Sequence, residues 1–343
     1  MESRTPSSPP LIHSIKDQKR PIWSVMIPVY NSIAYLRETI ESVLSQDLGE
    51  SLMEIEVVDD NSTDGNVREL VYQVSKGRVK YYKQHENVGS LRNFETCINR
   101  SSGHYIHLLH ADDRVENGFY KEIDELFNLY PQVGAAFTNF LYIDHQSKDL
   151  TISAPNLFNE SGVLPDFLRI IAKHQLIQPP AMVVKRSTYE RLGGFYGVHY
   201  GEDWEMWTRI AANFPIAYSP KTLAKYRVGH GQGISHHSFL EGRNVSDIMK
   251  VIDNIQIHLP NELKAQTKRQ SLAYHAKFNI KLAGSFLSNN KAAAFRQIKG
   301  AWQMDKSINT IAWIIRFYLM YLLRYKSIHK RIYQVKSTIS LKT

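Results

Sequence analysis

The feature that most constrains the fold is an alternation of short apolar runs and helical patterns between residues 22 and 135. Apolar runs occupy 22–29, 53–58, 79–82 and 105–109. Between them, apolar residues recur at the three- and four-residue spacing of a helix. Strands that alternate with helices form a parallel sheet with right-handed crossovers. We therefore predict an α/β fold built on a doubly wound, mostly parallel sheet with flanking helices.

The later part of the chain is less regular. A helix is expected at 119–129, a strand at 135–142 and a polar loop at 143–163. An edge strand or hairpin interrupted by Pro220 is expected at 216–226. The remainder should contain only helices, at 239–257, 261–288, 291–303 and 309–325. This pattern predicts a flexible leader at 1–21, a catalytic domain at 22–236 and a C-terminal helical region at 237–343.

Composition limits the cellular setting. The single cysteine, Cys97, excludes an intramolecular disulfide and fits a reducing compartment. Residues 1–21 lack the apolar run of a secretory signal, and no apolar stretch of about 18 residues could span a bilayer. The net charge is +9, and residues 306–343 contain eight Lys or Arg and no acidic residue. This tail suits an anionic surface, and 309–325 resembles an interfacial helix, although packing on protein is the alternative.

Three acidic sites follow strands or open helices, at 59–60, 112–113 and 202–203. Any one of them could be an ordinary turn, because aspartate caps helices and bonds its own backbone. In open α/β sheets, however, ligands bind at the carboxyl ends of the strands. Carboxylates that face a nucleotide there need a cation, and Mg²⁺ or Mn²⁺ can bridge them to a diphosphate.

The usual phosphate-binding loops are missing. The chain has no Gly-x-x-x-x-Gly-Lys-Ser/Thr motif and no Gly-x-Gly-x-x-Gly motif after its first strand. This argues against a P-loop NTPase and against a nicotinamide-dependent dehydrogenase. A nucleotide held through a metal ion is the chemistry that remains.

Several motifs occur in a fixed order between residue 22 and about residue 230. They are Ile27-Pro28-Val29-Tyr30-Asn31, Val57-Val58-Asp59-Asp60-Asn61-Ser62, Asn87-Val88-Gly89, Ala111-Asp112-Asp113, Leu192-Gly193-Gly194-Phe195 and Gly201-Glu202-Asp203. In this order and spacing, the chain resembles the family 2 glycosyltransferases, which have the GT-A fold. Members of this family use a nucleotide-diphosphate sugar, most often a UDP-sugar, and invert its anomeric centre.

The resemblance implies a donor pocket and a metal site. The donor-binding residues would be Pro28, Val29, Tyr30, Asn31, Asp60, Arg92 and Asp112. Asp113 would bind Mg²⁺ or Mn²⁺, and His230 would be a further ligand or would contact the diphosphate. Family members often have Asp-Ala-Asp-Asp where this chain has His110-Ala111-Asp112-Asp113. The site therefore has one negative charge fewer, and we expect His110 to pack or to support the site rather than to bind metal.

The resemblance also implies a catalytic base. Inversion by a single displacement needs a carboxylate to take the proton of the acceptor hydroxyl, and Asp203 would have this role. Its position at a helix start favours the ionised form, although a helix N-cap is the alternative. Glu202 and Trp204 would bind the acceptor, and Trp207 is expected to lie in the core.

The donor-binding residues have ordinary alternatives as well. Tyr30 would pack on the base or ribose, but core packing is its alternative. Asp60 would accept a hydrogen bond from the base, which requires a carboxylate with no competing partner; its alternative is a cap of the turn at 61–64. Arg92 could neutralise the diphosphate or lie on an exposed helix face.

We therefore predict a metal-dependent, inverting glycosyltransferase that adds one sugar to a saccharide or lipid-linked acceptor in surface polysaccharide or glycolipid synthesis. It would work in the cytoplasm, peripheral to the inner face of the membrane through 306–343. No nucleic-acid partner is expected, and a homodimer is left open. One alternative is a catalytically idle sugar-nucleotide-binding or scaffold protein of the same fold. Another, an enzyme that makes nucleotide sugars, would need a Gly-rich signature that is absent.

Overall fold

The structure is a computed structural model that describes residues 4–16, 19–153, 156–229, 231 and 233–322. The chain divides into two compact units. The first comprises Met1–Phe167 and Leu176–Val228, and the second comprises Leu168–Gln175 and Gly229–Thr343.

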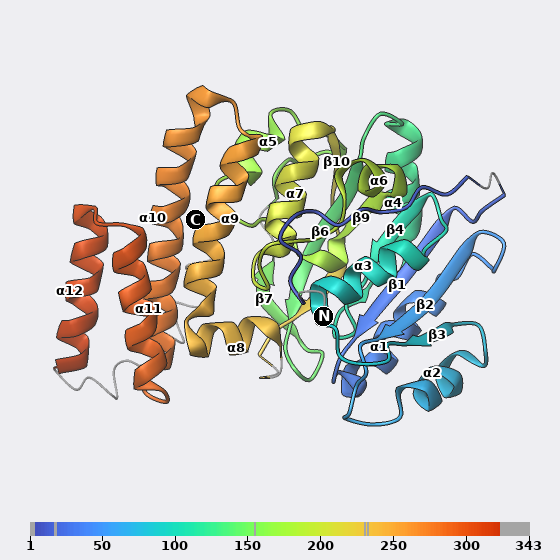
Figure 1. The fold of residues 1–343 in the computed structure, drawn as a ribbon, viewed down its shortest axis with the longest axis horizontal. Coiled ribbons are helices and arrows are strands. Elements are labelled where there is room, and N and C mark those ends of the chain that lie inside the picture. Colours follow the sequence, from blue (N-terminus) through green and yellow to red (C-terminus); the bar gives the residue numbers. More distant parts are fainter. Residues whose placement is uncertain (1–3, 17–18, 154–155, 230, 232, 323–343) are drawn as a thin grey trace. The chain divides into compact units, whose positions relative to one another are not determined.

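One sheet runs through the first unit (Figure 1). Its strands are β1 (Trp23–Val29), β2 (Met53–Asp59), β3 (Lys80–Lys83), β4 (Tyr105–Leu108), β5 (Arg114–Val115), β6 (Ala135–Ile143), β7 (Asp149–Ser153), β8 (Gly162–Val163), β9 (Met182–Lys185) and β10 (Ile216–Arg227). The main strand order is β3-β2-β1-β4-β9-β6-β10-β5, with β7 beside β6 and β8 beside β10. β1 is parallel to β2 and β4, and β3 is parallel to β2, which confirms the predicted parallel sheet. β9 runs antiparallel to both β4 and β6.

Helices connect and flank these strands. They are α1 (Ile33–Leu44), α2 (Val67–Ser75), α3 (Ser90–Arg100), α4 (Phe119–Leu129), α6 (Arg186–Leu192) and α7 (Glu202–Asn213), with a 3-10 turn at Pro179–Ala181. All seven residues of β1 are buried, as expected for a parallel strand covered on both faces. Trp23, the first residue of β1, is fully buried and makes edge-to-face contacts with Tyr105 and Tyr120. The hydrophobic core therefore extends to the start of β1.

Two predictions about the later strands are wrong. The segment 143–163 is not only a polar loop, because it contains β7 and β8. β10 is not an edge strand, because it pairs with β6 on one side and with β5 and β8 on the other. A register shift between Ser219 and Thr222 accommodates Pro220, which cannot donate a ladder hydrogen bond.

The predicted flexible leader is also wrong for residues 4–16, which we call the N-terminal strap. The strap packs along the first unit (dark blue in Figure 1), and its Ile12 is only 2% exposed. The backbone N–H of Gly194 donates to the carbonyl of Pro10 at 2.9 Å, and Arg186 donates to the carbonyl of His13 at 2.8 Å. These contacts depend on distant parts of the chain, so local composition could not reveal them.

The second unit is helical, as expected after residue 239. Its helices are most of α5 (Phe167–Ile171), α8 (Ile234–Glu241), α9 (Arg243–His258), α10 (Asn261–Phe286), α11 (Lys291–Met304) and α12 (Ile308–Leu322). The single helix expected at 239–257 is wrong, because Gly242 separates α8 from α9. A buried amide network of Asn244, Asn279 and Gln297 joins α9, α10 and α11. The predicted tail helix corresponds to α12, and residues 323–343 lie outside the described residues. Among the described residues, no helix combines the length and the apolar character needed to cross a membrane.

Candidate active site

Hydrogen bonds join the loops that follow β1 and β2, where the donor pocket is expected. The N–H of Asn31 donates to Ser62 Oγ at 3.1 Å, and Asn31 Oδ1 accepts from the N–H of Thr63 at 2.8 Å. Asn31 has a φ of 49°, a left-handed conformation that asparagine tolerates. Tyr30 is 49% exposed, so core packing does not explain it. Pro28 and Val29, by contrast, are buried within β1.

Asp60 was predicted to accept a hydrogen bond from the base through a carboxylate with no competing partner, but its carboxylate already has partners within the protein. It is buried and accepts the N–H of Val88 at 2.8 Å, the N–H of Gly89 at 2.9 Å and Nδ2 of Asn87 at 3.0 Å. Burial raises the pKa of Asp60, and the two backbone N–H groups oppose that rise. Since three donors already compete for the carboxylate, Asp60 acts first as the support of the loop at 87–89. It does not cap the turn at 61–64.

Asp59 is a buried structural residue. Its two oxygens accept from the N–H of Ser62 at 2.8 Å and from the hydroxyl of Tyr81 at 2.7 Å. Both oxygens of this carboxylate are therefore satisfied within the protein.

Potential metal ligands gather after β4. His110, Asp112 and Asp113 each offer one ligand atom, and these atoms all lie within 4.8 Å of one another. Asp113 is 1% exposed; its Oδ1 accepts the N–H of Arg227 at 2.9 Å, while its Oδ2 is buried with no hydrogen-bond partner among the described residues. Burial and the adjacent Asp112 carboxylate raise the pKa of Asp113 well above its ordinary value. A buried carboxylate oxygen without a donor suits a divalent cation.

His110 belongs to this group more closely than the sequence suggested. Its ring stacks on Phe94 with centroids 5.1 Å apart, which fixes the orientation of the imidazole. Burial lowers the pKa of His110, although Asp112 opposes the change, so the neutral imidazole is favoured. Neutral imidazole is a ligand for Mn²⁺ and related metals.

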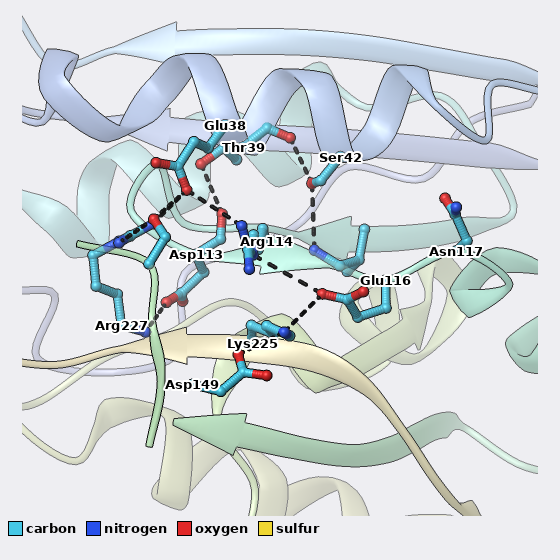
Figure 2. A network of polar contacts seen from close by, with 12 residues as sticks. Glu38, Thr39, Ser42, Asp113, Arg114, Glu116, Asn117, Asp149, Lys225 and Arg227 are labelled. Atoms are coloured by element: carbon cyan, nitrogen blue, oxygen red, sulfur yellow. Dashed lines mark hydrogen bonds and ion pairs between the residues drawn. The ribbon is translucent and has the colours of Figure 1, made fainter. Parts of the chain in front are cut away.

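Arg227 braces the metal-ligand loop, as Figure 2 shows. Its Nε donates to the carbonyl of Asp112 at 2.7 Å, and its Nη2 donates to Glu38 at 3.0 Å. From α1, Thr39 Oγ1 donates to the carbonyl of Asp113 at 2.7 Å. Burial would raise the pKa of Glu38, but hydrogen bonds from Ser147 and Arg227 hold it below the ordinary value. This network positions the backbone of the loop without using Asp113 Oδ2.

Helix α7 presents the candidate base. Gly201, with a φ of 88°, is its N-cap, so the N-cap alternative for Asp203 is wrong. Asp203 lies in the first turn, where its Oδ1 accepts the N–H of Trp204 at 2.7 Å. Glu202 is buried beside it. Trp204 is 0% exposed, so the prediction that it binds the acceptor is wrong.

One small cavity connects α7 with the metal-ligand group. It is lined by Phe94, Leu108, His110, Pro179, Met182, Tyr189, Phe195, Glu202, Asp203 and Trp207. The sequence prediction missed its apolar walls, of which only Phe195 lay in a quoted motif. Trp207 is buried as predicted, yet it also lines the cavity.

Arg92, which was predicted to bind the donor, is not among the residues that line this cavity. It lies on α3 and forms an ion pair with Glu95 at 2.7 Å, so part of its charge is neutralised. Its role toward the donor stays a prediction. His230 lies outside the described residues.

The first unit has the fold of the GT-A glycosyltransferases. The crystal structure of S. aureus TarS 1-349 in complex with UDP-GlcNAc matches the chain with a TM-score of 0.62 and 16% identity, over 91% of each chain. This likeness shows the fold alone.

The sequence comparisons find glycosyltransferases. Residues 24–178, a little under half of the chain, match the model of Glycosyl transferase family 2. An uncharacterized glycosyltransferase of Rickettsia felis is 26% identical over 70% of this chain, and the chain spans only 41% of that relative. The minor teichoic acid biosynthesis protein GgaB of Bacillus subtilis is 31% identical over 31% of this chain and 12% of its own length.

Proposed function

We propose that this protein is a metal-dependent, inverting glycosyltransferase that moves one sugar from a nucleotide-diphosphate donor, UDP-linked in the simplest case, to a saccharide or lipid-linked acceptor. The observation that carries the proposal is the cavity lined by both His110 and Asp203. A metal-bound diphosphate on one side and a base on the other are what a displacement at the anomeric carbon requires. The sugar class, hexosyl or N-acetylhexosaminyl, is open at this point.

The residues divide the work as follows. Asp112, Asp113 and His110 would hold Mg²⁺ or Mn²⁺, which when bound would neutralise the charge of the leaving diphosphate. Asp203 accepts the proton of the acceptor hydroxyl while the hydroxyl oxygen bonds to the anomeric carbon. The bond to the diphosphate breaks, and its electron pair leaves with the nucleotide. Exposed Tyr30 offers a stacking surface to the base or ribose.

A role in surface polysaccharide or glycolipid synthesis is supported by the likeness to GgaB, whose name places that protein in teichoic acid synthesis. The TarS complex holds UDP-GlcNAc, which supports a UDP-sugar donor for this chain.

Asp203→Asn tests the catalytic assignment. We expect unchanged binding of UDP with Mn²⁺ by calorimetry, but a loss of sugar transfer of at least about a hundredfold, because general-base catalysis contributes about 10²–10⁴. Glu125→Gln, an exposed carboxylate on α4, is the control. Retained turnover in Asp203→Asn would refute the base. A wild-type protein that binds UDP-sugars but releases no nucleotide with any acceptor would favour the idle scaffold instead.

We further propose that α12 rests on anionic lipid at the cytoplasmic face of a membrane. Its Trp313, Ile315, Tyr318, Leu319 and Leu322 are exposed, and residues 306–343 add eight cationic and no acidic side chains. Apolar burial plus charge attraction is how interfacial helices bind.

Ile315→Asp with Leu319→Asp tests this proposal. The pair should abolish sedimentation with vesicles that contain phosphatidylglycerol, whereas Ile257→Asp, at an exposed position of α9, should not. If the paired variant still sediments with the vesicles, the lipid surface is wrong.

A further inference from the structure

The N-terminal strap (dark blue in Figure 1) contacts the loop at 193–201, which leads directly into α7. The carbonyl of Pro6 accepts the N–H of Gly197 at 2.9 Å. The carbonyl of Pro10 accepts the N–H of Gly194, also at 2.9 Å. The strap therefore holds the backbone of this loop at two points, a few residues before the helix that carries the candidate base.

His199 lies in the same loop, four residues before Asp203. Its Nε2 lies 2.5 Å from the hydroxyl oxygen of Thr5 in the strap, and its Nδ1 lies 3.5 Å from the hydroxyl oxygen of Ser90. Ser90 is the first residue of α3 and follows the loop at 87–89. The imidazole therefore lies between the strap and the start of α3, on the side of the expected donor pocket.

Arg209 joins this loop to α7. Its Nη1 donates to the carbonyl of Leu192 at 2.6 Å, and its Nη2 donates to the carbonyl of Gly194 at 2.9 Å. The guanidinium is paired with Glu205 at 3.0 Å, and both side chains are almost fully buried. Separating these groups would leave a buried charge without its partner, which is strongly unfavourable. A displacement of the loop is therefore transmitted to the first turns of α7, where Asp203 lies.

The apolar and the polar contacts of the strap lie in different places. Ile12 is 2% exposed and contributes apolar burial to the first unit. Thr5 is only half-buried, and its hydroxyl contacts the loop before α7. Because the two contacts belong to different residues, substitution of Thr5 can separate a role in the active site from a role in stability.

We propose that the strap is a positioning element of the active site, in which Thr5 acts through His199 to hold Asp203 in place for proton transfer. The proposal rests on the function proposed above, in which Asp203 is the base. Misplacing a reacting group by about 1 Å can lower a rate by about a hundredfold, so a hydrogen-bonded contact of this kind matters for turnover. In this role neither Thr5 nor His199 contacts the donor, so the effect falls on kcat and not on donor binding.

Thr5→Val, which keeps the shape of the side chain and removes its hydroxyl, tests the proposal. The assay is UDP release from UDP-GlcNAc, with Mn²⁺ and the saccharide acceptor that the wild type uses fastest. We expect kcat to fall at least about tenfold while the KM for UDP-GlcNAc changes by less than about twofold. Thr5→Ser keeps the hydroxyl and should retain the wild-type kcat. Ser8→Ala, at an exposed position of the same strap, is the control and should retain it too.

A double substitution tests whether Thr5 acts through His199. His199→Phe keeps a planar ring but removes both ring nitrogens, so it should lower kcat at least as much as Thr5→Val does. Adding Thr5→Val to His199→Phe should then change kcat no further, because the contact is already lost. If the two effects multiply instead, Thr5 does not act through His199 and the proposal is wrong.

Hydrogen exchange measures the positioning without relying on turnover. In the fragment 194–205, which includes the two N–H groups that donate to the strap, exchange should be at least about threefold faster in Thr5→Val and unchanged in Ser8→Ala. Unchanged exchange in Thr5→Val overturns the proposal, and so does a lower Tm with an unchanged kcat, which would show a role in stability alone. A wild type that releases no UDP with any acceptor overturns the proposed function, and the exchange result then decides whether the strap positions α7.

Discussion

Because Asp113 Oδ2 has no hydrogen-bond partner among the described residues, we predict that a substitution of Asp113 stabilises the metal-free protein. Asp113→Asn removes a buried ionisable carboxyl group, retains the Oδ1 that accepts the N–H of Arg227, and replaces the oxygen that has no donor. Without metal, we expect the variant to be more stable than the wild type. Asp59→Asn is the matched control, because the Asp59 carboxylate is equally buried but has a donor on each oxygen. The same substitution there should destabilise the fold.

The magnitudes follow from the partners of each group. An unsatisfied buried acceptor costs about 1–3 kcal/mol, and the new side-chain amide in Asp113→Asn would recover only part of that cost. We therefore expect Asp113→Asn to gain about 1 kcal/mol and Asp59→Asn to lose about 1 kcal/mol. In a unit of this size, each kilocalorie moves the Tm by about 2–4 °C. Adding metal at about a hundred times its Kd should stabilise the wild type by about 2.7 kcal/mol and leave Asp113→Asn unaffected.

Thermal unfolding in a chelating buffer, and again with saturating Mn²⁺, measures both effects. The expected result is an inversion of rank: Asp113→Asn melts above the wild type without metal and below it with metal. If Asp113→Asn melts below the wild type in the chelating buffer, Oδ2 has a partner in solution and the metal-site reasoning fails. If Mn²⁺ stabilises both proteins equally, Asp113 is not a ligand.

Two other predictions concern the strap and the second unit. Gly193 has a φ of +79°, and an added Cβ would lie 2.8 Å from the strap carbonyl of Pro10, so Gly193→Ala should cost about 1–3 kcal/mol in urea unfolding and expose the strap to protease. Gly118→Ala has a similar φ and no nearby atom, so it should cost less and leave the strap protected; equal effects would refute the packing. Burial lowers the pKa of His275 to about 3, so the unfolded chain binds a proton that the folded one does not between about pH 6.5 and 3. His275 should therefore contribute a fall in stability of about 1.4 kcal/mol for each pH unit of acidification in that window, and His275→Gln should reduce the measured slope by that amount; an unchanged slope would contradict it.

The sequence revealed the features that depend on neighbouring residues. The strand that ends at Tyr30 and the acidic loop at Asp113 are contiguous motifs, and both lie where the alternation of strands and helices predicted. The failures concern partners far along the chain. Nothing near Asp60 indicated that residues 87–89 would occupy its carboxylate, and nothing near Trp204 distinguished a buried indole from an exposed one. The indole N–H of Trp207, which is buried with no acceptor among the described residues, likewise depends on tertiary packing and not on the neighbouring sequence.

The strap has a practical consequence for how the protein is shortened. The family match covers residues 24–178, but the folded unit also needs Ile12 before it and α7 and β10 after it. A version trimmed to the matched residues would lose Asp203 and Arg227 and would uncover the apolar surface beneath Ile12. A purification tag at the amino end would also disturb these contacts, because residues 4–6 contact Asn87, His199 and Gly197. A tag at the amino end therefore needs a spacer, or it will compete for the surface that the strap occupies.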